Sequence, residues 1–151
     1  MKKHMLILIA ILSLMSCDTR DCDDMSCFTP PPVFLFKIVD KASGENLYTN
    51  GTLNSDDIKI TDKNGKQLQY TFITENNVNL LQADEFGWDS NISTYYIDPG
   101  NGIKIDIALN SQMKNENCCS FYEISDFSVL NYSYTVENST GIIIVEIPAQ
   151  T

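Results

Sequence analysis

Two basic residue types are almost absent from this chain of 151 residues, which holds one histidine, His4, and one arginine, Arg20. Residues 21–151 therefore carry no imidazole, which excludes Ser-His-Asp catalysis, Cys-His catalysis and histidine-bound zinc in that part of the chain. They also carry no guanidinium for a bidentate clamp on phosphate or carboxylate. The chemistry that remains is that of carboxylates and lysines, or binding without a reaction.

Long apolar runs are also scarce, because the one such run spans residues 5–15 and follows Lys2 and Lys3. A charged start, a short apolar run and small residues at its end predict a secretory signal, since the run is too short for a spanning helix. The run ends in Leu14-Met15-Ser16-Cys17, which resembles the lipobox of bacterial lipoproteins. That resemblance implies removal of residues 1–16 and a covalent lipid on Cys17 that anchors the protein to the outer membrane. The alternative is an ordinary signal peptide that ends near a cysteine.

The charge of the chain is strongly acidic. Removal of residues 1–16 takes two of the ten basic residues and none of the twenty acidic ones, which leaves 135 residues with a net charge of −12. This length suits one domain with a modest core. Nucleic acid and anionic lipid are poor partners for such a surface, whereas cations and neutral partners such as glycans suit it.

An acidic, hydrophilic segment follows Cys17, with aspartates at positions Asp18, Asp21, Asp23 and Asp24. It predicts a tether that does not enter a core. Its position is similar to the surface-export signal of Bacteroidetes lipoproteins and implies the cell surface; the alternative is a plain spacer on the periplasmic face. Pro30-Pro31-Pro32 then predicts an extended hinge. We therefore divide the chain into the signal peptide (1–16), the lipidated cysteine with tether and hinge (17–32), and a domain (33–151).

From Val33 onward, apolar residues recur with the period of two that is typical of strands. The alternation is clearest at Ile103, Ile105, Ile107 and Leu109, and Asn64-Gly65 predicts a type I′ hairpin turn. Residues 111–117 read as a polar loop. Eight or nine short strands without a helix predict a single antiparallel β-sandwich, with strands near residues 34–38, 58–61, 68–72, 78–82, 95–97, 103–110, 118–130, 132–137 and 142–147. We expect the last strand to be internal, because it is β-branched on both faces.

Residues 36–47 give a further likeness, because their sequence Phe-Lys-Ile-Val-Asp-Lys-Ala-Ser-Gly-Glu-Asn-Leu resembles the opening of small exported domains. Such immunoglobulin-like or transthyretin-like modules are common in Bacteroidetes lipoproteins. The resemblance implies a sandwich of one of these two kinds.

Four cysteines remain besides Cys17, namely Cys22, Cys27, Cys118 and Cys119. An even set in an oxidising compartment predicts disulfides. Of the three pairings, the one that joins Cys118 to Cys119 is strained, and the other two connect Cys22 and Cys27 to the later pair. Either would dock the tether on the domain. A thiolate metal site is the disfavoured alternative.

One stretch interrupts the strand pattern and offers a binding site, Asp84-Glu85-Phe86-Gly87-Trp88-Asp89, with Tyr95 and Tyr96 nearby. An exposed tryptophan beside carboxylates can stack on a sugar ring while the carboxylates hold its hydroxyls. However, the chain has one tryptophan, and such a residue in a small sandwich more often fills the core. We therefore favour a core position for Trp88 and keep the ligand platform as the alternative.

Acidic residues allow two weaker hypotheses. Calcium could bind loop carboxylates, either Asp56, Asp57 and Asp62 or Asp84, Glu85 and Asp89, although no spacing requires it. The adjacent pairs Asp56-Asp57 and Asp84-Glu85 could support glycoside hydrolysis, although neighbours on a strand face apart. We expect no cofactor other than the lipid on Cys17. The expected function is a non-enzymatic, accessory, adhesive or structural lipoprotein whose partner is a glycan or another envelope protein; the alternative is ligand binding at Trp88.

Overall fold

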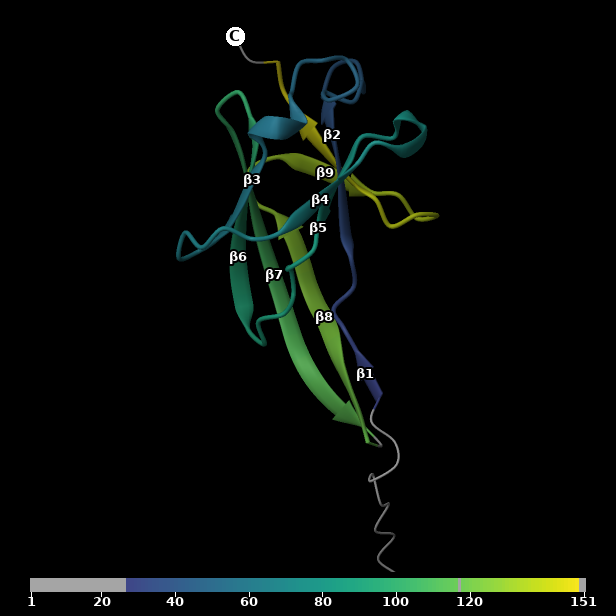
Figure 1. Ribbon diagram of the computed structural model, residues 1–151, viewed down its shortest axis with the longest axis vertical. Coiled ribbons are helices and arrows are strands. Elements are labelled where there is room, and N and C mark those ends of the chain that lie inside the picture. The colour runs from purple at the N-terminus through teal and green to yellow at the C-terminus, as the bar shows by residue number, and fades with distance from the viewer. Residues whose placement is uncertain (1–26, 117, 150–151) are drawn as a thin grey trace, which may run out of the picture.

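The computed structural model describes residues 27–116 and 118–149. The predictions for the signal peptide, Cys17, the aspartates of the tether and Cys22 lie outside these residues. The described part is an all-β sandwich of two five-stranded sheets, which confirms the predicted fold class (Figure 1). Its helices are the two short 3₁₀ turns η2 (Ser55–Asp57) and η3 (Glu75–Asn77), and none in this part is long and apolar enough to cross a membrane.

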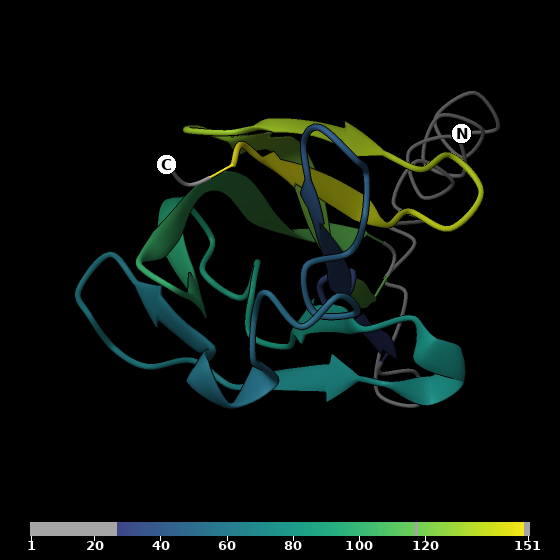
Figure 2. The same cartoon turned by 90° about the horizontal axis from the view of Figure 1, so that it is seen from above.

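The first sheet has the strand order β1-β8-β7-β6-β3, with bounds β1 Cys27–Thr29, β8 Cys119–Val129, β7 Ile103–Glu116, β6 Ile92–Gly100 and β3 Lys59–Asp62. The second has the order β4-β5-β2-β10-β9, with bounds β4 Tyr70–Ile73, β5 Leu80–Ala83, β2 Phe34–Asp40, β10 Ile143–Ile147 and β9 Ser133–Val136. The last strand, β10, is internal as predicted. Seen from above, the yellow β10 and yellow-green β9 lie on the opposite side of the molecule from the teal β4–β5 region (Figure 2).

Both sheets are mixed, so the prediction of wholly antiparallel sheets is wrong at two pairings. β1 pairs parallel with β8, and β2 pairs parallel with β10. Neighbouring turns predict only local antiparallel pairs, whereas these partners are far apart in sequence and no hairpin fixes their direction. Residues 27–29, which the sequence places in the tether, are thus the edge strand of the first sheet, and Pro31 of the predicted hinge is buried.

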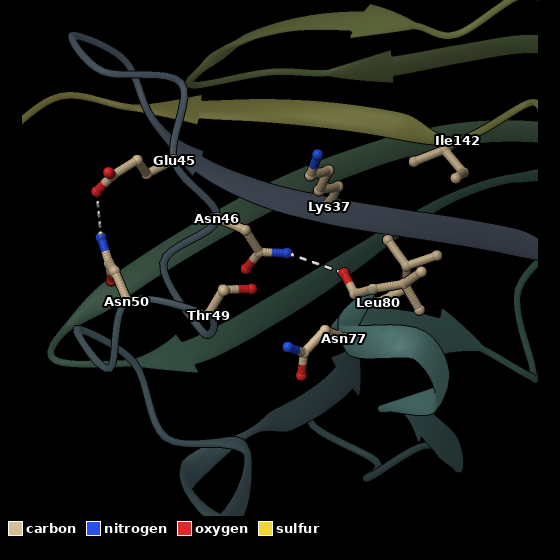
Figure 3. A pocket seen from close by; sticks show the side chains of 9 residues that line it. Lys37, Glu45, Asn46, Thr49, Asn50, Asn77, Leu80 and Ile142 are labelled. Carbon is tan, nitrogen blue, oxygen red and sulfur yellow. Dashed lines mark hydrogen bonds between the residues drawn. The ribbon is translucent and has the colours of Figure 1, made fainter.

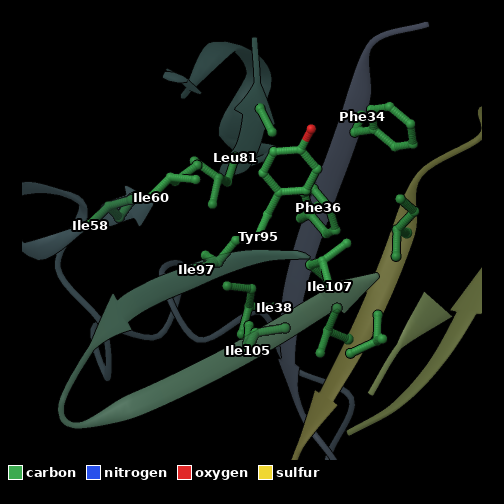
Figure 4. Close-up of a cluster of buried hydrophobic side chains, with 14 of the residues drawn as sticks. Phe34, Phe36, Ile38, Ile58, Ile60, Leu81, Tyr95, Ile97, Ile105 and Ile107 are labelled. Atoms are coloured by element: carbon green, nitrogen blue, oxygen red, sulfur yellow. The ribbon is translucent and has the colours of Figure 1, made fainter. Parts of the chain in front are cut away.

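The core lies between the sheets and follows the predicted alternation. Phe36 and Ile38 of β2 are buried, as are Ile105 and Ile107 of β7, and Figure 4 shows these side chains pointing toward one another. Their neighbours along both strands are only partly buried or exposed, except Val39, which is also buried. Burial of each such side chain contributes about 1.5–3 kcal/mol.

The turns at Asn64-Gly65 and Asn101-Gly102 differ in a way the sequence did not predict. At Asn64-Gly65 only the glycine has a positive φ; the backbone N–H of Asp62 donates to the carbonyl of Lys66, and the carbonyl of Asp62 accepts from the N–H of Gly65. This is a longer turn than type I′, and the carboxylate of Asp62 stabilises it by accepting from the backbone N–H groups of Asn64 and Lys66. The two-residue turn with positive φ at both positions is Asn101-Gly102, which joins β6 to β7.

The predicted polar loop at residues 111–117 is also wrong, because β7 continues to Glu116 and pairs with β8 as far as Cys119. Pairing with β8 satisfies the backbone N–H and C=O groups of these residues, although their side chains show no apolar alternation that would predict a strand. Here β7 and β8, together with β1, project beyond the second sheet (Figure 1). We call this projection the ribbon and define it as residues 27–29, 111–116 and 119–124.

Candidate functional site

Trp88 lies on the surface, with 46% of its area exposed, so the favoured expectation of a core position is wrong. The residue that fills the core from this loop is Phe86, which is 2% exposed. Its ring stacks on that of Tyr95 with the centroids 4.2 Å apart. Since Phe86 occupies the core, Trp88 two residues later is left at the surface.

The backbone beside Trp88 is fixed by buried polar groups. The N–H of Gly87 donates to the hydroxyl of Tyr95 at 3.3 Å, and its carbonyl accepts from the hydroxyl of Ser111 at 2.6 Å. Ser111 is a buried polar residue of β7. Gly87 has φ +83°, and a Cβ there would lie 3.1 Å from the Cβ of Pro31. Trp88 is therefore held on a backbone with little freedom to move.

Two aromatic side chains of the ribbon lie beside Trp88. The Trp88 ring centroid lies 6.0 Å from that of Phe28 on β1 and 5.7 Å from that of Tyr122 on β8. Met113 of β7 is the register partner of Tyr122. Phe28 and Met113 are 51% and 45% exposed. We call Phe28, Trp88, Met113 and Tyr122 the aromatic tip.

Trp88 also forms part of the wall of a hollow with a volume of about 600 Å³, which we call the Trp88 hollow. Its lining residues are Asp62, Asn64, Lys66, Leu68, Asp84, Glu85, Trp88, Asp89 and Tyr95. Four carboxylates thus face one lysine, whose Nζ lies 3.9 Å from Oε2 of Glu85. The volume lies within the range of small-ligand sites. The hollow combines a flat apolar ring with several hydrogen-bond acceptors.

The structure brings together most of the residues predicted around Trp88, namely Asp84, Glu85, Asp89 and Tyr95. Tyr95 is almost wholly buried, and burial raises the pKa of its hydroxyl. Tyr96 does not belong to the site. It follows Tyr95 on β6 and so points to the opposite face of the sheet, where the Lys104 ammonium lies 4.1 Å from its ring centroid.

Sequence reasoning predicted a turn at Asn64-Gly65 but did not place it at the hollow, which receives Asp62 from the end of β3 and Asn64 and Lys66 from this turn. Burial would raise the pKa of Asp62, but the backbone N–H groups of Lys66 and Asn64 outweigh that effect and lower it. Asp84 is fixed as well, because its carboxylate accepts from Gln82 at 2.6 Å and from Thr71 at 2.9 Å. Two of the four carboxylates are therefore held in place before any ligand arrives.

The calcium hypotheses gain no support from these positions. Asp56 and Asp57 lie in η2, before β3, whereas Asp62 ends that strand, so the first set does not share a loop. Both carboxylate oxygens of Asp84 already accept a hydrogen bond, one from Thr71 and the other from Gln82. Among residues 27–116 and 118–149, no group of three or more His, Cys, Asp or Glu side chains is placed to hold a metal ion.

A second hollow, of about 410 Å³, lies over β2 and the loop before β5 (Figure 3). Its lining residues are Lys37, Glu45, Asn46, Thr49, Asn50, Asn77, Val78, Leu80 and Ile142. Two of its three amides are engaged within the protein, since Asn46 donates to the carbonyls of Val78 and Asn79 and Asn50 donates to Glu45. None of its lining residues is aromatic. The Trp88 hollow is therefore the stronger candidate for a ligand with a flat apolar face.

A disulfide joins Cys27 to Cys119, with the Cα atoms 4.6 Å apart, and Cys118 is disulfide-bonded as well. The predicted link from Cys27 to the later cysteine pair is confirmed, and a bridge between Cys118 and Cys119 is excluded. Two bridges at adjacent residues require a break in the strand, and Cys118 has φ +72° just before β8 begins. The Cys27 bridge fixes β1, and hence Phe28, beside Trp88.

Comparison with known proteins gives no relative: no protein-family model, curated protein or solved structure matches the chain.

Proposed function

We propose that this protein is a non-enzymatic, lipid-anchored binding module of the cell envelope that holds an uncharged sugar in the Trp88 hollow. The observation that carries the proposal is the exposed ring of Trp88 in the wall of a 600 Å³ hollow that also contains four carboxylates. A pyranose has a face of C–H groups that stacks on an indole ring and an edge of hydroxyls that donate to carboxylate oxygens. The hollow offers both partners.

Charge favours this class of ligand over acidic sugars. The four carboxylates of the hollow outnumber Lys66, and the chain as a whole has twenty acidic and ten basic residues. A negatively charged ligand would be repelled both at the site and during its approach. A neutral sugar avoids that repulsion.

The envelope location rests on the sequence of the N-terminal segment. The ending Leu14-Met15-Ser16-Cys17 supports a covalent lipid on Cys17, and the acidic tether supports exposure on the outside of the outer membrane. An adhesive or accessory role, with a glycan or another envelope protein as partner, follows from that place. Protease treatment of intact cells, with lysed cells as control, tests it: cleavage on intact cells places the domain outside, and cleavage only after lysis places it on the periplasmic face.

Sugar binding can be measured directly, because Trp88 is the sole tryptophan and borders the hollow, so all tryptophan fluorescence comes from the site. Titration with neutral oligosaccharides should change its emission, and calorimetry on the Trp88→Ala variant should show at least a tenfold loss of affinity, as expected for a buried aromatic contact worth about 1.5 kcal/mol or more. Tyr96→Ala is the matched control on the opposite face of β6. Equal affinity of wild-type protein and the Trp88→Ala variant would contradict the proposal.

A further inference from the structure

The aromatic tip is a contiguous apolar surface at one end of the molecule. Phe28, Trp88 and Met113 are each about half exposed, and Tyr122 lies between them on the same face of the ribbon. Single exposed apolar residues are common on soluble proteins, but a cluster of large ones usually marks a surface that contacts something else. No strand of the second sheet covers it.

The place of the tip in the chain indicates what it contacts. Phe28 follows Cys27 at the start of β1, at the end of the molecule opposite to the C-terminal residues of β10 (Figure 1). Cys17 precedes Cys27 by ten residues. Ten residues span at most about 35 Å when fully extended. A lipid on Cys17 would therefore keep the aromatic tip close to the membrane that holds that lipid.

We propose that the aromatic tip is a membrane-contacting surface, in which Phe28, Met113, Tyr122 and the edge of Trp88 enter the interface of the bilayer that holds the anchor. The inference rests on the lipid anchor of the proposed function. Tryptophan and tyrosine favour the boundary between head groups and acyl chains, because each has an apolar body and a polar tip. A second contact beside the lipid also strengthens anchoring, which a single acyl chain leaves reversible.

The charges around the tip select the kind of surface. Asp89 carries a negative charge next to Trp88, and the chain as a whole has twenty acidic and ten basic residues. Glu116 and the ion pair between Lys114 and Glu123, at 3.6 Å, lie on the opposite face of the ribbon from Met113 and Tyr122. This favours zwitterionic or neutral head groups over anionic ones. The contact also leaves the ligand site accessible, since Phe28, Met113 and Tyr122 do not line the Trp88 hollow.

The test uses the full chain, produced in bacteria with its own N-terminal signal and reconstituted into phosphatidylcholine vesicles with either plain or brominated acyl chains. Bromine quenches tryptophan only at short range, and Trp88 is the sole tryptophan. We expect a loss of Trp88 emission in the brominated vesicles and recovery of that emission in the double variant Phe28→Ser, Met113→Ser. Leu130→Ser is the control, since Leu130 is similarly exposed but lies outside the ribbon.

Flotation of the vesicles separates the two proposals. Protein that fails to float with the vesicles lacks the anchor, and both the envelope proposal and this inference then fail. Protein that floats with unquenched Trp88 overturns the membrane contact alone, and a dimer seen by light scattering in that case would assign the tip to a second copy. Quenching that the double variant leaves unchanged would also overturn it, because the contact would not involve the tip.

Discussion

Side chains alternate between the two faces along the whole of strand β7, but its two halves lie in different surroundings. In its first half, Ile105 and Ile107 face the second sheet and are fully buried. In its second half, Met113 lies on the same face of the strand but is 45% exposed, because the second sheet does not extend that far. The strand is continuous, and it pairs with β6 over its first half and with β8 from Ile107 to Glu116.

This contrast shows that alternation sets the face a side chain occupies, whereas the opposite layer decides whether that face is buried. The second sheet does not reach over the ribbon, and the loop that carries Trp88 covers part of the face of β7 there. It covers Ser111 completely and leaves the aromatic tip half covered. The candidate ligand site and the proposed membrane contact both lie at this boundary between covered and uncovered strand.

The most direct test of the contrast is a pair of truncations on one face of β7. Ile105→Ala should reduce the free energy of unfolding by about 2–5 kcal/mol, because it removes fully buried methyl groups and leaves a cavity. Met113→Ala should reduce it by about 0.5 kcal/mol or less, as for other surface changes. Urea unfolding followed by circular dichroism measures both. Equal losses would show that the ribbon is packed as tightly as the core.

The disulfide should stabilise the ribbon where the core does not. Replacing both Cys27 and Cys119 by serine should cost about 2–4 kcal/mol, since the bridge closes a long loop in the unfolded chain. The emission of Trp88 should change as well, because the bridge holds Phe28 beside it. Chemical unfolding and native-state fluorescence give the two readouts. A stability loss without any change in fluorescence would indicate that β1 keeps its place without the bridge.

The attachment of the Trp88 loop can be loosened at Gly87. We expect Gly87→Ala to cost about 1–3 kcal/mol, because the new Cβ is strained at a positive φ and also crowds Pro31 and Ile124. Gly141→Ala is a matched control, since Gly141 has φ +73° but open space around it. The difference between the two variants in thermal unfolding isolates the packing of the loop. No difference would mean that the loop yields to the extra carbon.

The smallest expected effect concerns the turn that borders the hollow. Asp62 has a pKa below its ordinary value of 3.8, so the unfolded chain binds a proton on this carboxyl more readily than the folded protein does. The contribution of Asp62 to the free energy of unfolding is therefore complete above the ordinary pKa and is lost as the pH falls through the lowered pKa. The difference in melting temperature between wild-type protein and Asp62→Asn should be present at pH 7 and shrink in strong acid. A difference independent of pH would contradict this origin.

The sequence predicted the features that follow from the alternation of apolar residues and from the pairing of cysteines. The strands around Phe36 and Ile105, the internal position of β10 and the link from Cys27 to the later cysteine pair all follow from local patterns. The ribbon could not be predicted, because residues 111–116 alternate without an apolar face. The loop contains both Phe86 and Trp88, and only the shape of the core decides which of them is buried. The contribution of Asp62 and Lys66 to the hollow depends on a turn far from Trp88 in the chain.

The bridge between Cys27 and Cys119 also determines how the domain responds to mechanical load. These cysteines are 92 positions apart, so force applied between the residues before Cys27 and the C-terminal end passes through the bridge and cannot extend the backbone between them. Only the segment after Cys119 can lengthen. Its last strand, β10, runs parallel to β2, so it must slide along that neighbour and break their shared hydrogen bonds together rather than one by one. Under tension the domain therefore extends by a short length and only after a concerted rupture.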